Sequence, residues 1–419
     1  MADVQPLRAL HYDLAKVGPL ADVVAPPYDV IDPALRRHLS ARSPYNVVHV
    51  DLPEGSGDPY AVAARTFTGW QREGAVVRQS QPGLWALTQS YDAPGGGGHR
   101  RRHGFLCRVR LEDYGPGRVR PHERTHPGPK EDRLRLTRAT RANLSPIFAL
   151  HSDPRRAAWN ALEPATHEAP WGETVDADGT EHRVWCVEDP DAIAAVQEAL
   201  AGAELLIADG HHRYETARVY AEEVGGEGAH RYVLMCLVAL EDPGLTVFPT
   251  HRLVRGLRPE QHETLANAIR DAFEVTEVDR AALVPQGDGP LRIGYLDAHF
   301  KRPFMLTLKD PAIADRALAG KPEPYRRLDT AVLEAVLLKG ALGMTDDDVS
   351  HLRGMGYARD DEEAWQLVDS AEFDAAFFMR ATPVEEVREV AAAGESMPPK
   401  STYFFPKLLT GMVFNPLVD

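Results

Sequence analysis

The sequence predicts a mixed α/β protein, in which short strands alternate with helices along 419 residues. Two patterns support this prediction. Short apolar runs bounded by Gly, Pro or Asp indicate strands, and the longer amphipathic stretches between them indicate helices. At 43% hydrophobic and 26% charged residues, the chain is apolar enough to bury a core and is not disordered by composition. We find no internal repeat.

The elements follow one another in a regular order. Strands are expected where β-branched or aromatic residues cluster, at 8–12, 45–52, 84–91, 105–112, 147–151, 182–187, 205–208, 231–240, 273–278, 291–296, 304–308, 373–379 and 411–414. Helices are expected where apolar residues recur at helical spacing, at 33–41, 60–73, 132–143, 191–201, 211–224, 259–273, 329–342 and 384–393.

Gly and Pro clusters divide the chain. The glycine run at 95–98 joins two strand-like segments and predicts a hairpin loop. A break near 256–259 and a linker at 319–326 predict two regions. Residues 1–256 are expected to form the first region, which carries the inserted hairpin. Residues 257–419 are expected to form a C-terminal α/β region.

Charge and composition exclude several classes of protein. The net charge of −15 argues against general nucleic-acid binding. The longest apolar run, at 233–240, is far shorter than the roughly 20 residues of a membrane-spanning helix. Three separated cysteines fit reduced thiols, and the N-terminus has no secretory signal. We therefore expect a cytoplasmic protein that crosses no membrane.

The most informative local pattern is a strand-to-helix elbow at 209–213. An apolar strand ends at Asp209, Gly210 permits a tight turn, and a helix follows. The first turn of a helix presents free N–H groups and a positive dipole end, which suit an anion. Asp209 is expected to cap the helix or to act as a base. The predicted phosphate-binding residues are Gly210, His211, His212, Arg213 and Thr216.

Two alternatives stay open at this elbow. It is also compatible with an ordinary capped helix whose histidines only pack. His211 and Glu215 stand four residues apart, which is a metal-ligand spacing, but the HExxH order is missing. We therefore predict no metal held by the protein itself.

A second cluster of polar residues lies at 122–133. Lys130 and Arg133 could neutralise a transferring phosphoryl group, and Glu123 or His122 could take a proton from an attacking hydroxyl. The Pro and Gly residues at 127–129 predict a stiff loop before the helix at 132–143. The alternative is a salt-bridged surface loop. We also predict that five residues line the substrate side, namely Tyr28, Asp29, Thr250, His251 and Lys400.

These motifs resemble two known groups. Over nearly its whole length the chain resembles the DUF1015 family of bacterial and archaeal proteins. This resemblance is carried by Ala25-Pro-Pro-Tyr-Asp-Val-Ile31, Tyr45-Asn-Val-Val48, His122-Glu-Arg-Thr125, Gly128-Pro-Lys130, Asn143-Leu-Ser-Pro-Ile-Phe148, the elbow, and Met397-Pro-Pro-Lys-Ser-Thr-Tyr-Phe404. The elbow itself resembles the phosphate-binding box of the ParB/sulfiredoxin superfamily.

The branches of that superfamily differ at position 211. Sulfiredoxins carry a catalytic Cys there and ParB proteins a Glu, whereas the free-serine kinases have the same Asp-Gly-His-His-Arg sequence as residues 209–213. The resemblance therefore implies that residues 1–256 form a phosphate- and nucleotide-binding core and that residues 257–419 close over its site. It also implies phosphoryl transfer or hydrolysis with ATP or a related nucleotide and Mg²⁺. It implies a small hydroxylated or phosphorylated metabolite, similar to serine or phosphoserine, as substrate. A non-catalytic nucleotide sensor and a phosphatase that needs no nucleotide are the alternatives.

Overall fold

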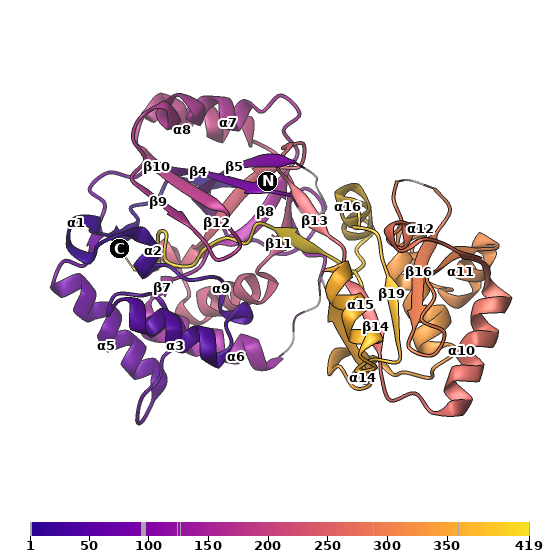
Figure 1. Ribbon diagram of the computed structural model, residues 1–419. Helices are drawn as coiled ribbons and strands as arrows, with labels where there is room; N and C mark the ends of the chain where they lie inside the picture. Colours follow the sequence, from indigo (N-terminus) through magenta and orange to yellow (C-terminus); the bar gives the residue numbers. More distant parts are fainter. Residues whose placement is uncertain are drawn as a thin grey trace. The chain divides into compact units, whose positions relative to one another are not determined.

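The computed structural model describes residues 2–93, 98–123, 125, 127–287, 289–358 and 360–418. The chain forms two compact units (Figure 1). Unit 1 comprises Met1–Pro121, Thr125–Leu245 and Pro406–Asp419, and unit 2 comprises His122–Arg124 and Thr246–Phe405. The division differs from the expected single boundary at 256. Strand β14 (His251–Val254) pairs with β18 (Met355–Ala358) and β19 (Ala375–Phe378), so unit 2 begins before that boundary.

A large mixed sheet forms the centre of unit 1. Its strand order is β6-β11-β8-β12-β5-β4-β10-β9, and β1 also pairs with β5. The pairs β11–β6 and β12–β8 are parallel and the others are antiparallel. The strands are β1 (Val4–Gln5), β4 (Leu84–Asp92), β5 (His99–Arg110), β6 (Val119–Arg120), β8 (Ile147–His151), β9 (Gly172–Val175), β10 (Glu181–Val187), β11 (Leu205–Asp209) and β12 (Tyr232–Ala239). This architecture confirms the mixed α/β prediction.

The inserted hairpin is formed by β4 and β5. These strands pair in an antiparallel register that places Trp85 opposite Leu106. Buried apolar side chains on both strands hold the hairpin in the sheet. The hairpin is therefore confirmed, while residues 95–97 of the glycine loop expected at 95–98 fall outside the described residues.

Helices cover the sheet of unit 1. In Figure 1, α7 and α8 lie above the strands, and α3, α5, α6 and α9 lie below them. Apolar side chains of α7, α8 and α9, such as Trp159, Val196 and Tyr214, share one buried cluster with the strands. The helices are α1 (Leu14–Val17), α2 (Leu20–Val23), α3 (Pro33–Arg42), α5 (Pro59–Arg72), α6 (Pro127–Thr140), α7 (Ala157–Leu162), α8 (Pro190–Ala199) and α9 (His211–Val224), with short 3₁₀ turns at Tyr28–Val30, Glu163–His167 and Ala229–Arg231.

The segment expected as a strand at 45–52 is instead a turn followed by α4 (Val48–Asp51). Asn46 is fully buried and its amide donates to the carbonyls of Asp22 (2.8 Å) and Val24 (3.1 Å). Its side-chain oxygen Oδ1 accepts from the backbone amide of Val48 (3.1 Å) and so starts the helical turn. Apolar alternation favoured a strand here, and this buried side chain overrides it.

The chain's last segment returns to unit 1. Thr410 exchanges backbone hydrogen bonds with Ala25, and Phe414 does so with Leu10. Strand β21 (Asn415–Pro416) pairs with β7 (Ala142–Asn143), and β2 (Leu10–Tyr12) pairs with β3 (Val76–Arg78). The segment is therefore part of the core of unit 1.

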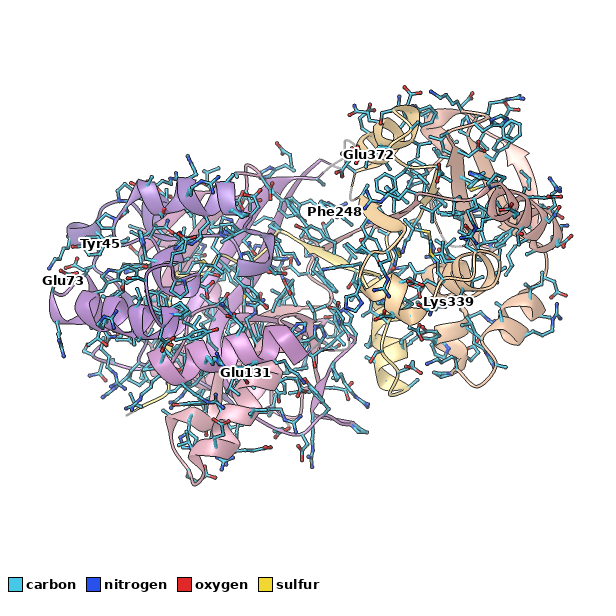
Figure 2. All side chains as sticks on the ribbon, turned by 90° about the horizontal axis from the view of Figure 1, so that it is seen from below. Tyr45, Glu73, Glu131, Phe248, Lys339 and Glu372 are labelled. Atoms are coloured by element: carbon cyan, nitrogen blue, oxygen red, sulfur yellow. The ribbon has the colours of Figure 1, made fainter. Side chains whose placement is uncertain are left out.

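Unit 2 contains a six-stranded antiparallel sheet of order β15-β17-β16-β19-β14-β18. The remaining strands are β15 (Phe273–Glu277), β16 (Arg292–Asp297), β17 (Phe304–Leu308), β13 (Thr246–Phe248) and β20 (Tyr403–Phe405). Phe248 (Figure 2) stacks on Phe405 across the β13–β20 pair. The helices are α10 (Pro259–Ala272), α11 (Pro311–Ala317), α12 (Glu323–Arg326), α13 (Asp329–Val332), a π-helical segment (Leu333–Lys339), α14 (Asp346–Ser350), α15 (Asp361–Asp369) and α16 (Val384–Ala392), with a 3₁₀ turn at Arg280–Ala282. Among the described residues of the whole chain, no helix is long and apolar enough to cross a membrane.

Candidate functional site

The elbow forms as the sequence predicts. Strand β11 is buried up to Ala208, Gly210 adopts a φ of 99°, and α9 begins at His211. A side chain at position 210 would be strained at this φ, and its Cβ would lie 3.0 Å from Nε of Arg213. Gly210 therefore allows a tight turn between β11 and α9. As a result, the N-terminus of α9, which is the positive end of its dipole, lies directly after the end of the strand.

Asp209 does not cap the helix, so that expectation is wrong. Gly210 is the N-cap of α9, and Asp209 is the last residue of β11. The Asp209 carboxylate instead accepts from Nζ of Lys407 (3.0 Å) and lies 3.6 Å from Nη2 of Arg213. Burial alone would raise the pKa of this carboxyl, but Lys407 and Arg213 together hold the pKa well below its usual range. Asp209 is therefore ionised and paired at neutral pH.

Arg213 extends from the first turn of α9 into a pocket. Its Nη1 donates to Oγ of Ser145 (3.1 Å) and to the carbonyl of Pro146. Only 14% of its side chain is exposed. These contacts fix the guanidinium in position, which is what an anion-binding group requires.

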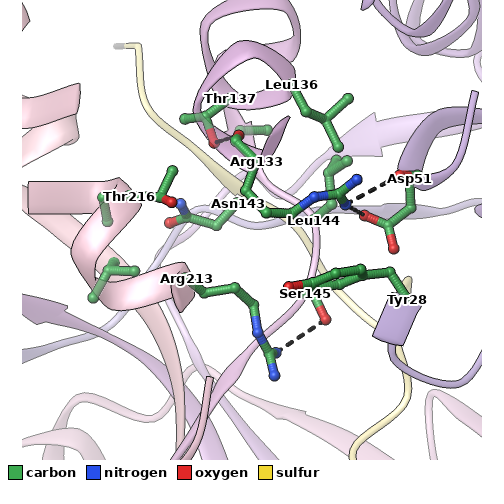
Figure 3. A pocket seen from close by; sticks show the side chains of 13 residues that line it. Tyr28, Asp51, Arg133, Leu136, Thr137, Asn143, Leu144, Ser145, Arg213 and Thr216 are labelled. Atoms are coloured by element: carbon green, nitrogen blue, oxygen red, sulfur yellow. Dashed lines mark hydrogen bonds and ion pairs between the residues drawn. The ribbon is translucent and has the colours of Figure 1, made fainter. Parts of the chain in front are cut away.

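The pocket is a small cavity of about 40 Å³, and all of its lining residues belong to unit 1. Figure 3 shows Arg213 pointing into it from α9 and Arg133 from α6. The structure thus brings together four residues that the sequence predicts for the site: Tyr28, Arg133, Arg213 and Thr216. The other lining residues are Asp51, Leu136, Thr137, Ala142, Asn143, Leu144, Ser145, Ala217 and Val233.

Arg133 is held by two carboxylates. Its Nη1 lies 2.9 Å from Oδ1 of Asp51, and its Nη2 lies 2.6 Å from Oδ2 of Asp132. The guanidinium also lies over the ring of Tyr28, 4.3 Å from its centroid, in a cation–π arrangement. Arg133 therefore joins α6 to α4 and to the Tyr28 turn, on one wall of the pocket.

Asp51 is the carboxylate of the pocket, and sequence reasoning missed it. It is 4% exposed, and burial raises its pKa against the opposing effects of Arg133 and Arg213. Its partner Arg133 lies 82 positions away in the sequence. The available signal was an aspartate directly after Val47, Val48 and Val50, inside the segment at 45–52 that was expected to be a strand.

Lys130 lies on α6 next to α9, since its carbonyl accepts from Oγ1 of Thr216 at 3.5 Å. Helix α6 begins at Pro127, so the expected stiff loop at 127–129 is instead the first turn of this helix. Proline is well tolerated at that position because the amide it lacks has no intrahelical acceptor. Asp29 is exposed on the turn that carries Tyr28.

His122 and Glu123 belong to unit 2. Nε2 of His122 lies 3.0 Å from Oγ1 of Thr402, and its carbonyl accepts from the Met397 amide (2.7 Å). The His122 ring also packs edge-on against Phe404. His122 therefore contacts the 397–404 segment within unit 2.

The remaining predicted residues also lie in unit 2. The buried Arg252 donates to the carbonyls of Thr250 and Pro399, which joins the 250 region to the 397–404 segment. His251 accepts from the Met379 amide (3.1 Å), and burial lowers the pKa of His251 to about 4. Lys400 is exposed and has a φ of 55°.

No group of three or more His, Cys, Asp or Glu side chains within the described ranges is arranged to hold a metal ion. At the elbow, Glu215 lies 3.5 Å from Arg218 and hydrogen-bonds with Tyr114. The Glu215 carboxylate therefore already interacts with Arg218 and Tyr114, although its position in the sequence relative to His211 is typical of metal ligands.

The fold and this pocket define the chain as a mixed α/β protein with a basic pocket behind a strand-to-helix elbow. The chain belongs to the family described as "Protein of unknown function (DUF1015)", whose sequence profile matches residues 4–331. This membership confirms the resemblance seen in the sequence motifs. No curated protein sequence matches the chain.

Several solved structures are similar in part. A conserved hypothetical protein from Pyrococcus furiosus is 15% identical, with 69% of this chain and 88% of that chain covered and a TM-score of 0.33. A free serine kinase variant in complex with AMP is 14% identical, with coverage of 68% and 83% and a TM-score of 0.35. SbnI from Staphylococcus aureus, truncated at its C-terminus, is 13% identical, with coverage of 71% and 84% and a TM-score of 0.36. These identities and TM-scores are too low to transfer a site or an activity.

Proposed function

We propose that unit 1 binds the phosphate groups of ATP or a related nucleotide at the elbow. The observation that carries the proposal is the shared pocket, in which Arg213 of the α9 N-terminus faces the same cavity as Arg133 of α6. A helix N-terminus with a fixed guanidinium suits a phosphate, because both place hydrogen-bond donors and positive charge on one side. Thr216 supports the site by linking α9 to α6.

The proposed reaction is transfer or hydrolysis of the nucleotide's phosphoryl group, with a small hydroxylated or phosphorylated metabolite of the serine or phosphoserine type as substrate. The sequence Asp-Gly-His-His-Arg at 209–213, which matches that of free-serine kinases, supports this choice. Mg²⁺ would accompany the nucleotide phosphates rather than be held by a cluster of side chains. Lys130 is the proposed group that neutralises charge during transfer.

The proposed transfer to a hydroxyl also requires a proton acceptor. Asp209 suits it poorly, because a carboxylate whose pKa lies far below its usual range is a weak base. Glu123 and His122 remain the proposed acceptors from the sequence. The variant E123Q should lower turnover without weakening nucleotide binding, as isothermal titration and a coupled turnover assay would measure.

Binding of ATP, ADP, CTP and phosphoserine, measured by thermal shift and isothermal titration, tests the proposal. The variant R213A should weaken nucleotide binding at least tenfold. R218A is the matched control, because Arg218 on the same helix pairs with Asp113 and Glu215 and does not line the pocket. Equal losses in both variants, or no nucleotide binding by the wild type, would contradict the proposal.

The same titrations separate the two alternatives. Nucleotide binding without turnover of any tested acceptor would indicate a sensor. Binding of phosphoserine alone, with release of inorganic phosphate, would indicate a phosphatase that uses the same anion pocket.

A further inference from the structure

Most polar side chains of the pocket are already hydrogen-bonded within the protein. Oγ1 of Thr137 donates to the Arg133 carbonyl (2.9 Å), and Oγ of Ser145 lies 2.8 Å from Oγ1 of Thr410. The Asn143 amide oxygen accepts from the Leu234 amide (3.1 Å) and from Nδ2 of Asn415 (2.9 Å). These groups therefore build the pocket wall.

Asp51 differs from them. Its Oδ1 is bound by Arg133, but its Oδ2 is buried and has no hydrogen-bond partner in the part of the chain that the structure describes. Figure 3 shows this second oxygen pointing away from Arg133. Leaving a buried carboxylate oxygen without a donor costs free energy, so a native site of this kind calls for a donor from a ligand or from water.

The charges around the pocket restrict what that donor can be. Two guanidinium groups, Arg133 and Arg213, and one carboxylate, Asp51, line the pocket. Both arginines act electrostatically on Asp51, and both lower its pKa. A cationic ammonium would be repelled by the two arginines. A neutral hydroxyl can donate a hydrogen bond to Oδ2 of Asp51. If the molecule that carries it has no net positive charge, the two arginines do not repel it.

We propose that Asp51 binds, through Oδ2, the hydroxyl group of the small acceptor substrate in the pocket that Arg213 also lines. This inference rests on the proposed function, because it places the hydroxyl in the cavity where Arg213 would hold a phosphate. The ligand class is a small hydroxylated molecule that is anionic or neutral overall. Asp51 is then the group that distinguishes a hydroxylated substrate from its deoxy analogue.

Pairs of probes that differ by one hydroxyl test this proposal on the full-length protein. L-serine is compared with L-alanine, and 3-hydroxypropionate with propionate, by isothermal titration and thermal shift. We expect the wild type to prefer the hydroxylated member of at least one pair by tenfold or more, because a buried acceptor disfavours a ligand that leaves it unpaired. Equal affinity within both pairs, or no binding of any probe, overturns the proposal.

Variants of the two carboxylates on Arg133 locate the effect. D51N keeps the shape of the side chain and removes the charged acceptor, so the preference should fall to about threefold or less. D132N is the matched control, since Asp132 also binds Arg133 but does not line the pocket, and its preference should stay at the wild-type level. If D51N keeps the wild-type preference for the hydroxylated probe, Asp51 does not bind the hydroxyl of the ligand and the proposal is overturned. An ordered water would then be the donor to Oδ2.

ATP titration distinguishes failure of this inference from failure of the proposed function. If ATP binds in an Arg213-dependent manner but the probes show no hydroxyl preference, only the assignment of Asp51 fails. If the hydroxyl preference is present and ATP does not bind, the nucleotide proposal fails, but the assignment of Asp51 to the hydroxyl of a ligand stands. Should D51N not fold, the wild-type comparison still decides.

Discussion

The ammonium of Lys407 lies 3.0 Å from Oδ2 of Asp209, and this ion pair joins the last segment of the chain to the elbow at 209–213. The two residues are 198 positions apart. Both side chains are largely buried, at 18% and 23% exposure. Because Asp209 also lies beside Arg213, the C-terminal segment helps to fix the charge distribution of the candidate site.

The variant K407A should destabilise unit 1 by about 1–3 kcal/mol, because it leaves a largely buried carboxylate without its main partner. Urea denaturation followed by tryptophan fluorescence measures this, since Trp365 is the one tryptophan of six that lies in unit 2. E227Q is the control: it removes the partner of Arg110 in an exposed pair and should change little. Equal effects of the two variants would contradict a structural role for the Lys407 pair.

The two site aspartates should respond to pH with opposite signs. The Asp209 pKa is lowered in the folded state, so this residue stabilises the protein above its unfolded pKa, about 3.9, and the stabilisation is lost as pH falls below that value. The Asp51 pKa is raised, so its contribution falls as pH rises above about 3.9.

Urea denaturation between pH 3 and 6.5 checks both signs. The stability of the wild type relative to D209N should increase with pH between 3 and 5, whereas its stability relative to D51N should decrease with pH above 4. Slopes of the same sign for the two aspartates would show that one of these pKa directions is wrong.

The elbow could be predicted from the sequence because its signals are local. An apolar strand, a glycine and a helical stripe follow one another directly, and the observed α9 has the predicted limits of 211 and 224. The hairpin of β4 and β5 was predictable for the same reason, since each strand carries a buried apolar stretch and the two are close in sequence.

The pocket could not be predicted because long-range contacts create it. Asp51 and Arg133 meet across 82 positions, and Asn46 sets the turn before Asp51 through bonds to carbonyls 22 and 24 positions earlier. No local pattern encodes such pairs, and apolar alternation at 45–52 favoured a strand. The sequence predicted that the C-terminal region folds back over the site, but it did not predict that residues 406–419 belong to unit 1. That placement depends on pairing with Leu10 and Ala25.

The packing of Phe414 should account for much of the stability that the C-terminal segment adds. Its side chain is fully buried, with ring centroids 5.2 Å from Phe67 and 5.6 Å from Tyr12. F414A should cost about 3–5 kcal/mol, because it removes a large apolar group and leaves a cavity. V418A, at an exposed position near the chain end, should stay within about 0.5 kcal/mol of the wild type. Small losses in both variants would place the segment outside the core.

Substitution of Gly210 tests whether the elbow's backbone positions Arg213. G210A should destabilise unit 1 by about 1–2 kcal/mol, since a Cβ is unfavourable at a φ of 99°. The new methyl group would also contact the Arg213 guanidinium, so nucleotide binding should weaken beyond the effect of stability alone. G69A is the control: Gly69 lies inside α5 with no atom within 4 Å of a Cβ, and alanine there should stabilise by about 0.5–1 kcal/mol. Thermal unfolding and ATP titration of both variants measure this contrast. A G210A protein that binds ATP like the wild type would show that Arg213 keeps its position without the glycine turn.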